Sequence, residues 1–348
     1  MSLLNKIITQ IRSDVPWSDL HIEQDAPVMA MVPGGWAEVE TDYQPGKPEM
    51  EELLGKLNHE WKRIIGTQSI KRTTHFDGWR VRLTACMASA GTKYVVSVRR
   101  IPVAPPTIES YGLPEVLEDI ARSKSGIFLV GGPTRSGKST TLAAMIDYIN
   151  GGFAKHIVTI EDPIEFAHER KRSIITPREV GLDVESFHKG VLDAMRQSPD
   201  IILVGEIRDH ETAEAAFLAA ESGHLVLAGT HGSTIHLSIQ KLLNLFPPEK
   251  REAKAGVLAA HLVGAMSQQL LPRADRKGWA LASEWMFNYQ RRFTKNVADV
   301  ERLGEIIARD GNDGCAMTLR KSLLALNGTV RPEDIAAASD INLGAIRA

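Results

Sequence analysis

The alternation of apolar and polar residues divides the chain into two parts with different predicted secondary structure. In the first part, residues 79–84 and 94–99 alternate apolar and polar side chains at every second position, a pattern typical of half-buried antiparallel strands. Residues 49–65 carry apolar side chains at helical spacing instead. We therefore predict a small α+β domain over residues 1–103.

A proline-rich segment follows this domain. Pro102, Pro105 and Pro106 lie close together, and Gly112 and Pro114 come shortly after them. Proline removes a backbone donor and disfavours helix in the residue before it. We therefore predict an extended linker over residues 104–114, which acts as a hinge.

After the linker, short apolar runs alternate with helical patterns. Strands are predicted at 126–131, 156–160, 201–204 and 225–228, and helices at 140–149 and 211–222. Asp209 is the expected N-cap of the second helix. Strands that alternate with helices indicate an α/β domain with a parallel sheet covered on both faces. We assign this domain to residues 115–348 and expect its part beyond Pro272 to be mostly helical.

The composition mainly excludes some classes of protein. The 348 residues are 43% hydrophobic and 24% charged, and 41 Lys and Arg oppose 43 Asp and Glu, so no basic nucleic-acid track is expected. Two cysteines, Cys86 and Cys315, cannot form a disulfide framework. Since the sequence has neither a run of about 20 apolar residues nor a recognisable signal peptide, we expect a soluble cytoplasmic protein.

The strongest chemical signal is a glycine-rich loop between a predicted strand and helix. Residues 132–139 read GPTRSGKS and fit the pattern G-x-x-x-x-G-K-[ST]. Glycines let such a loop curl so that backbone N–H groups and a helix N-terminus face an anion. Lys138 would reach the β- and γ-phosphates and Ser139 would ligate Mg²⁺; a glycine turn without a ligand is the alternative. The expected nucleotide-binding residues here are Gly132, Pro133, Thr134, Arg135, Ser136, Gly137, Lys138, Ser139 and Thr140.

Carboxylates follow two other predicted strands. Glu206 comes after four apolar residues and Gly205, the form of a strand that delivers an acid near a nucleotide-bound metal. Residues 159–165 hold Glu161, Asp162 and Glu165, whose mutual repulsion disfavours a purely structural role unless a cation or hydrogen bonds offset it. Because ligands bind at the carboxyl ends of parallel strands, one of these acids could orient the attacking water. A solvated turn is the alternative.

Two histidines flank the strand predicted at 225–228. His224 precedes it, and His231 follows it on the same edge as the acids. His231 is a candidate γ-phosphate sensor, with an ordinary turn histidine as the alternative. The chain has no [NT]-K-x-D string, which favours ATP over GTP as the nucleotide.

Taken together, these strings resemble the PilT-like secretion ATPases, the hexameric motors of type IV pili and of type II and type IV secretion. The loop at 132–139 resembles their Walker A box, and residues 157–166, 195–209 and 222–235 resemble the Asp box, Walker B box and His box. Residues 18–22 resemble the opening of the PilT-type N-terminal domain. Within the superfamily the chain is most similar to the PilT-like branch, which includes the DotB and TraJ types. The resemblance implies a RecA-like P-loop ATPase domain with a mainly parallel sheet, preceded by a smaller PAS-like α+β domain.

The resemblance also implies residue roles. It makes Glu165 the catalytic base and Glu206 the Walker B acid, which holds Mg²⁺ through water beside Ser139. In the family, arginines of the N-terminal domain reach the phosphates; for the matching positions here, a solvated strand face is the alternative. The other residues assigned in this way are His224 to nucleotide binding, and His231, Arg82 and Arg99 to catalysis.

Two departures from the family pattern bear on function. Arg135 replaces the glycine usual in the GPTGSGKS loop, which adds positive charge there. Residues 296–310 lack the AIRNLIRE string associated with pilus retraction, which favours the secretion or conjugation branch.

We therefore predict an ATP-hydrolysing homo-hexameric ring motor with ATP and Mg²⁺ as cofactors. It would work on the cytoplasmic side of the inner membrane with the platform proteins of a type IV secretion, conjugation or type IV pilus system, without binding nucleic acid directly. The main alternative is a P-loop ATPase that translocates nucleic acid, as a helicase or packaging motor does. A nucleotide-gated scaffold without turnover would be expected to lack the catalytic acid, but Glu165 and Glu206 are present.

Overall fold

The computed structural model describes residues 3–11, 15–39, 43–76, 79–102, 104–288, 303, 305, 307 and 316–338. The chain divides into two compact units. The first comprises residues 1–103 with 272–279, and the second comprises residues 104–271 with 280–348. The proline-rich segment 104–114 therefore belongs to the second unit.

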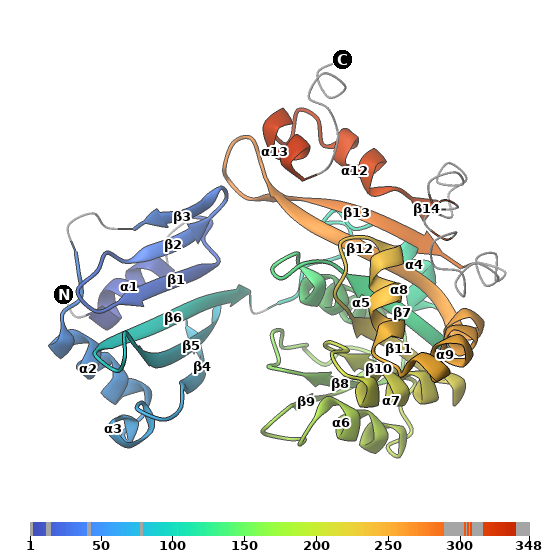
Figure 1. Cartoon of the computed structure of the whole chain (residues 1–348), viewed down its shortest axis with the longest axis horizontal. Coiled ribbons are helices and arrows are strands. Elements are labelled where there is room, and N and C mark those ends of the chain that lie inside the picture. The colour runs from blue at the N-terminus through green and yellow to red at the C-terminus, as the bar shows by residue number, and fades with distance from the viewer. Residues whose placement is uncertain are drawn as a thin grey trace. The chain divides into compact units, whose positions relative to one another are not determined.

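The first unit contains a six-stranded antiparallel sheet in the order β3-β2-β1-β6-β5-β4 (Figure 1). Its strands are β1 (Asp19–Glu23), β2 (Met29–Val32), β3 (Gly35–Glu38), β4 (Ile70–Phe76), β5 (Trp79–Ala88) and β6 (Lys93–Pro102). β5 and β6 contain the two alternating stretches of the sequence and pair from Trp79 opposite Pro102 to Ala88 opposite Lys93. The period-two pattern thus forms antiparallel strands, as predicted.

One face of this sheet forms a core with helices α1 (Leu3–Ile11), α2 (Lys47–Leu57) and α3 (Trp61–Ile64). Val81 and Val98 from the central strands are buried there together with Met50 of α2. The helical pattern over 49–65 is realised as two helices, because Asn58 adopts an extended backbone and ends α2.

The second unit is built on an eight-stranded mixed sheet in the order β14-β13-β12-β7-β11-β10-β8-β9. The six strands from β12 to β9 in this order are parallel, while β13 and β14 pair antiparallel. The strands are β7 (Gly126–Gly131), β8 (His156–Glu161), β9 (Ile174–Glu179), β10 (Ile201–Val204), β11 (Leu225–Gly229), β12 (Leu262–Pro272), β13 (Trp279–Phe287) and β14 (Ala316–Met317). The four predicted strands correspond to β7, β8, β10 and β11.

Helices cover both faces of this sheet. They are α4 (Val116–Ala121), α5 (Lys138–Gly152), α6 (Phe187–Met195), α7 (His210–Glu221), α8 (Ile235–Asn244), α9 (Pro248–His261), α12 (Leu319–Ala325) and α13 (Pro332–Ala337). Ile127 and Leu129 of β7 point into a core with α6 to α9, whereas Phe128 and Val130 point into a core with α4 and α5. Within the described ranges, no helix is long and apolar enough to cross a lipid bilayer.

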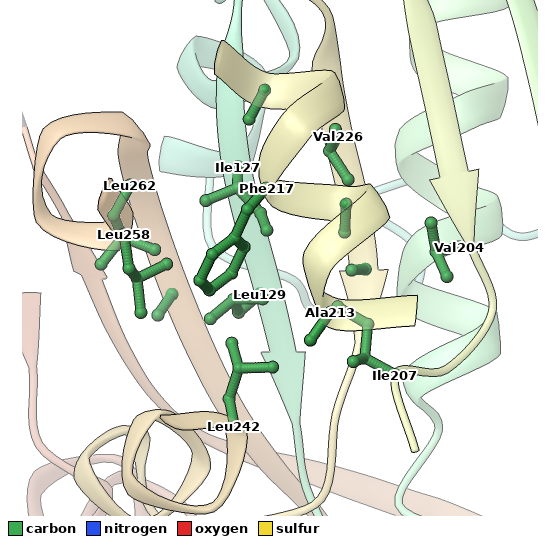
Figure 2. Packing of buried hydrophobic residues seen from close by; sticks show 14 of the residues in the cluster. Ile127, Leu129, Val204, Ile207, Ala213, Phe217, Val226, Leu242, Leu258 and Leu262 are labelled. Carbon is green, nitrogen blue, oxygen red and sulfur yellow. The ribbon is translucent and has the colours of Figure 1, made fainter. Parts of the chain in front are cut away.

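Phe217 of α7 lies inside the core formed with α6 to α9 (Figure 2). It is 1% exposed, and the centroid of its ring lies 5.5 Å from that of Phe246. Figure 2 also shows Leu258 and Leu129 close to this ring. Truncating such a buried aromatic side chain to alanine typically lowers the free energy of unfolding by about 3–5 kcal/mol. This core therefore stabilises the strands whose carboxyl ends carry the polar residues.

The chain beyond Pro272 differs from the mostly helical prediction. β13 lies beside β12 in the sheet and is followed by a further strand, β14, before the helices α12 and α13 begin. Pairing with an existing sheet edge decides the conformation of Trp279–Phe287, because strand propensity depends strongly on tertiary context. Of residues 296–310, which lack the retraction-associated string, only 303, 305 and 307 lie within the described residues, and Cys315 lies outside them.

Candidate nucleotide-binding site

The predicted site residues of the second unit gather where parallel strands end. The loop 132–139 follows β7, Glu165 follows β8, Glu206 follows β10, and His231 follows β11. These four strands are neighbours and run in the same direction. Their carboxyl ends therefore form one edge of the sheet, the usual location of ligand sites in such folds.

The loop adopts a backbone conformation that favours glycine at two positions. Gly132 and Gly137 have φ of +146° and +86°, and a Cβ on Gly132 would lie 2.4 Å from Ser136 Oγ. The Ser136 hydroxyl is buried in the loop and has no hydrogen-bond partner in the part of the chain that the structure describes. Gly137 is the N-cap of α5 and offers no side chain to the first N–H groups of that helix. The loop thus combines a buried hydroxyl with an uncapped helix N-terminus, which fits a phosphate group.

Lys138 is the first residue of α5, and its ammonium folds back over the loop. Nζ donates hydrogen bonds to the carbonyl oxygens of Gly132 at 2.8 Å and Pro133 at 3.0 Å. Burial lowers the pKa of Lys138; Glu206 raises it, Arg208 lowers it and Glu165 raises it. Both predicted catalytic carboxylates therefore lie within electrostatic range of this ammonium.

Glu206 is the centre of a charged cluster at this edge. Its side chain is only 12% exposed, and Oε2 accepts a hydrogen bond from Arg208 Nε at 2.6 Å. The other oxygen, Oε1, contacts Nε2 of His231. Because Glu206 and His231 follow the neighbouring strands β10 and β11, the cluster ties two strand ends together.

Glu165 lies in the segment after β8, which contains the cis peptide bond Asp162–Pro163. Its backbone N–H donates to Glu161 Oε2 at 3.5 Å, and Glu161 Oε1 accepts from the Thr159 hydroxyl at 2.8 Å. Glu161 thus makes hydrogen bonds within its own turn. Of the three acids in this segment, Glu165 is the one whose charge affects the pKa of Lys138.

Arg135 lies at the exposed rim of the loop. Its φ is +66°, in the left-handed region, where a side chain costs roughly 1–2 kcal/mol that glycine avoids. This conformation gives a structural reason why glycine is usual at the corresponding position of the family.

His224 is not brought to this edge. It precedes β11, and its Nδ1 lies 3.1 Å from the carbonyl oxygen of Ala219. Its own carbonyl accepts a hydrogen bond from the N–H of Gly126, where β7 begins. Because the strands are parallel, the full length of β11 separates His224 from His231 and from the phosphate loop of the same chain.

Arg82 and Arg99 belong to the first unit. They lie directly opposite each other on β5 and β6, and Arg99 Nε donates to Asp19 Oδ1 at 2.8 Å. Their neighbours Val81 and Val98 are in the core, so the two arginines lie on the other face of the sheet. The structure thus places them side by side, while their role at a phosphate stays a prediction.

Three residues around the site carry no motif in the sequence. Gln268 of β12 is 2% exposed; its Nε2 donates to the Ser136 carbonyl at 2.7 Å, and its Oε1 accepts from the Thr141 hydroxyl at 2.8 Å. Glu284 of β13 accepts from the N–H of Ile235 at 2.6 Å, and burial raises the pKa of Glu284. Arg208 could have been found because it follows Glu206 by two residues, but the other two reach the site only through the sheet.

A comparison with known protein families identifies the family of this chain. The type II/IV secretion system protein family matches residues 95–330. The chain belongs to this family. Among its relatives, the type IV pilus ATPase PilU of Pseudomonas aeruginosa is 40% identical over 209 residues, which are 60% of this chain and 53% of PilU. The chain thus spans about half the length of that relative.

Two solved structures of secretion and pilus proteins have the same fold. The pilus retraction motor PilT with bound ADP has a TM-score of 0.81 and 30% identity, and the match covers 100% of both chains. The ATPase DotB of Legionella pneumophila has a TM-score of 0.81, with 96% of this chain and 93% of DotB covered; at 23% identity it supports the fold alone. The predicted relation to the PilT-like secretion ATPases, and the predicted α/β fold with a smaller N-terminal domain, are therefore confirmed.

Proposed function

We propose that this secretion-family ATPase hydrolyses ATP as the subunit of a homo-hexameric ring motor, and thereby powers a type IV secretion, conjugation or type IV pilus system. The observation that carries this proposal is that Lys138, Glu165 and Glu206 follow parallel strands at one edge of the sheet, where both carboxylates influence the pKa of Lys138. A purely structural turn would not require a lysine and two carboxylates to gather at one edge of the sheet.

Nucleotide binding is assigned to the loop and to Lys138. The N–H groups at the start of α5 and the Lys138 ammonium would hold the β- and γ-phosphates, and PilT, which shares the fold, is described with bound ADP. The Ser139 hydroxyl and, through water, the Glu206 carboxylate are oxygen donors of the kind that Mg²⁺ prefers. The bound ion would supply neutralisation of phosphate charge.

Hydrolysis is assigned to Glu165 as general base. It accepts a proton from the water that attacks the γ-phosphorus, the bond from that phosphorus to the bridging oxygen breaks, and ADP and phosphate leave. His231, in contact with Glu206, would respond to the presence of the γ-phosphate. Arg82 and Arg99 would add positive charge to the transferring group when the two units close about the proline-rich segment.

The working location follows from the family. We place the ring on the cytoplasmic side of the inner membrane, where it would act on platform proteins of the machine. A direct nucleic-acid partner is not expected, since 41 basic residues are balanced by 43 acidic residues.

Sizing of the full chain with and without ATP and Mg²⁺, followed by ATP turnover on each fraction, tests this function. We expect turnover in a hexameric fraction, no turnover by Lys138→Ala, and nucleotide binding without turnover by Glu165→Gln. An active monomer, or either variant hydrolysing ATP at the wild-type rate, contradicts the proposal. Strong stimulation of turnover by DNA would favour a nucleic-acid translocase instead.

A further inference from the structure

The segment between the two units does not stay extended up to the ATPase core. Thr107 and Ser110 exchange hydrogen bonds between backbone N–H and side-chain hydroxyl, both at 3.0 Å. The N–H of Leu113 donates to the carbonyl of Ile108 at 2.9 Å, with Gly112 at φ +68° closing the turn. Ile108 and Leu113 are 5% and 6% exposed and belong to the core with α4 and α5. Residues 107–113 therefore form a capped turn that is anchored on the second unit.

Tyr111 extends from this turn to the phosphate loop. Its phenol oxygen lies so close to Gly137 that a Cβ on that glycine would be 2.3 Å away. The same oxygen is hydrogen-bonded to the side chain of Thr140, in the first turn of α5. Burial raises the pKa of Tyr111, so the phenol stays protonated at neutral pH. A residue of the connecting segment thus touches both the N-cap of α5 and the turn that follows it.

Gln268 supports the loop from a different side. It holds the carbonyl of Ser136 and the hydroxyl of Thr141 from strand β12. β12 belongs to the sheet, so this support is fixed together with the core. Tyr111, by contrast, belongs to the anchored turn that comes shortly after the unit boundary at residues 103 and 104, so its support is joined directly to the connecting segment.

We propose that Tyr111 is a positioning residue that couples the connecting segment to the phosphate loop. Its hydroxyl holds Gly137 and Thr140 in the conformation that receives the triphosphate. Nucleotide binding therefore tightens the turn 107–113, and a pull on the connecting segment weakens nucleotide binding. This role rests on the proposed hydrolysis of ATP at the same loop, and it adds a path from that loop to the segment between the units.

The test compares Tyr111→Phe with Tyr148→Phe in the full chain. Tyr111→Phe removes only the hydroxyl and keeps the packed ring. Tyr148 also lies on α5 and donates its phenol proton to Glu118 at 2.8 Å, but it is distant from the loop along the helix. Loss of one hydrogen bond predicts an increase in KM for ATP of about three- to tenfold for Tyr111→Phe, with kcat within about twofold. Tyr148→Phe should change neither constant by more than about twofold.

Hydrogen exchange separates coupling from a merely structural role. In the wild type and in Tyr148→Phe, a non-hydrolysable ATP analogue with Mg²⁺ should slow amide exchange over residues 107–113. In Tyr111→Phe this slowing should be lost, although the analogue still protects the start of α5 at saturation. Equal slowing in all three proteins, or an unchanged KM in Tyr111→Phe, overturns the role of Tyr111. A wild type without ATP turnover would refute the proposed function instead, and the exchange experiment would still decide the coupling.

Discussion

Strand β11 has a histidine beyond each end, and the two histidines have different surroundings. At the amino end, Nδ1 of His224 lies 3.1 Å from the carbonyl oxygen of Ala219. At the carboxyl end, His231 contacts the carboxylate of Glu206, which in turn affects the pKa of Lys138. Both residues are histidines close to the same strand in the sequence, and they differ in the edge of the sheet at which they lie.

In the second unit, the edge of the sheet at which a residue lies therefore decides, more than its type, whether it joins the candidate site. The three charged groups that affect the pKa of Lys138, namely Glu206, Arg208 and Glu165, follow the carboxyl ends of parallel strands, where the chain leaves the sheet and backbone N–H groups become available. At the amino edge, Lys155 and Asp200 form an ion pair that joins the starts of β8 and β10. The predictions below test this division, from the largest expected effect to the smallest.

The largest effect on stability should come from the core between the sheet and helices α6 to α9. Phe217→Ala removes a 1%-exposed ring and should lower the free energy of unfolding by about 3–5 kcal/mol. Leu218→Ala is the matched control, because the neighbouring side chain on the same helix is 45% exposed; it should cost less than about 1 kcal/mol. Urea unfolding measures both. Equal losses would mean that the core does not depend on Phe217.

The next effect contrasts the same substitution at opposite edges. Glu206→Gln removes the charge at the carboxyl edge and should lower kcat for ATP by about 10²- to 10³-fold. Glu221→Gln, at the end of α7 near the amino edge, should leave kcat within about twofold. Steady-state turnover with matched protein concentrations gives the comparison. A similar loss in both variants would remove the functional distinction between the edges.

The histidine pair offers a closer contrast. His231→Asn removes the imidazole that contacts the Glu206 carboxylate and should lower kcat by roughly tenfold, the size of one lost interaction with a charged group. His224→Asn should change kcat by less than about twofold, while its thermal midpoint falls slightly because the bond to Ala219 is altered. The turnover rates of the two variants give the comparison. A lower kcat for His224→Asn than for His231→Asn would contradict this contrast and would favour a role of His224 at the nucleotide of a neighbouring chain.

The smallest effect concerns pH and Glu284, which supports the start of α8 after His231. Burial raises the pKa of Glu284 above its ordinary 4.5, so just above pH 4.5 the folded protein keeps a proton that the unfolded chain has released. Stability is therefore lost as pH rises through the raised pKa. Glu284→Gln should lose less stability than the wild type between pH 4.5 and pH 8, as measured by urea unfolding. An identical loss in both proteins would show that Glu284 does not titrate in this window.

The strand prediction succeeded in part of the second unit and failed in another for a physical reason. β7, β10 and β11 are short apolar runs, and β8 has four consecutive buried residues between polar ends; such runs are recognisable because both of their faces are buried. β13 has a mixed composition and lies beside β12 in the sheet, a pairing that its own pattern of apolar and polar residues does not reveal.

The candidate site divides in the same way. Local patterns in the sequence predict the phosphate loop, Glu206 and His231, because each comes shortly after a predicted strand and so lies at the carboxyl end of that strand. Glu165 is one of three acids after another strand, and only the resemblance to the family singles it out. The tertiary structure alone decided that Gln268, Glu284 and Tyr111 support the site, while the nucleotide-binding role of His224, at the opposite edge, stays a prediction. These decisions depend on strand order and on contacts between residues far apart in the chain, which local patterns of hydrophobicity and charge do not encode.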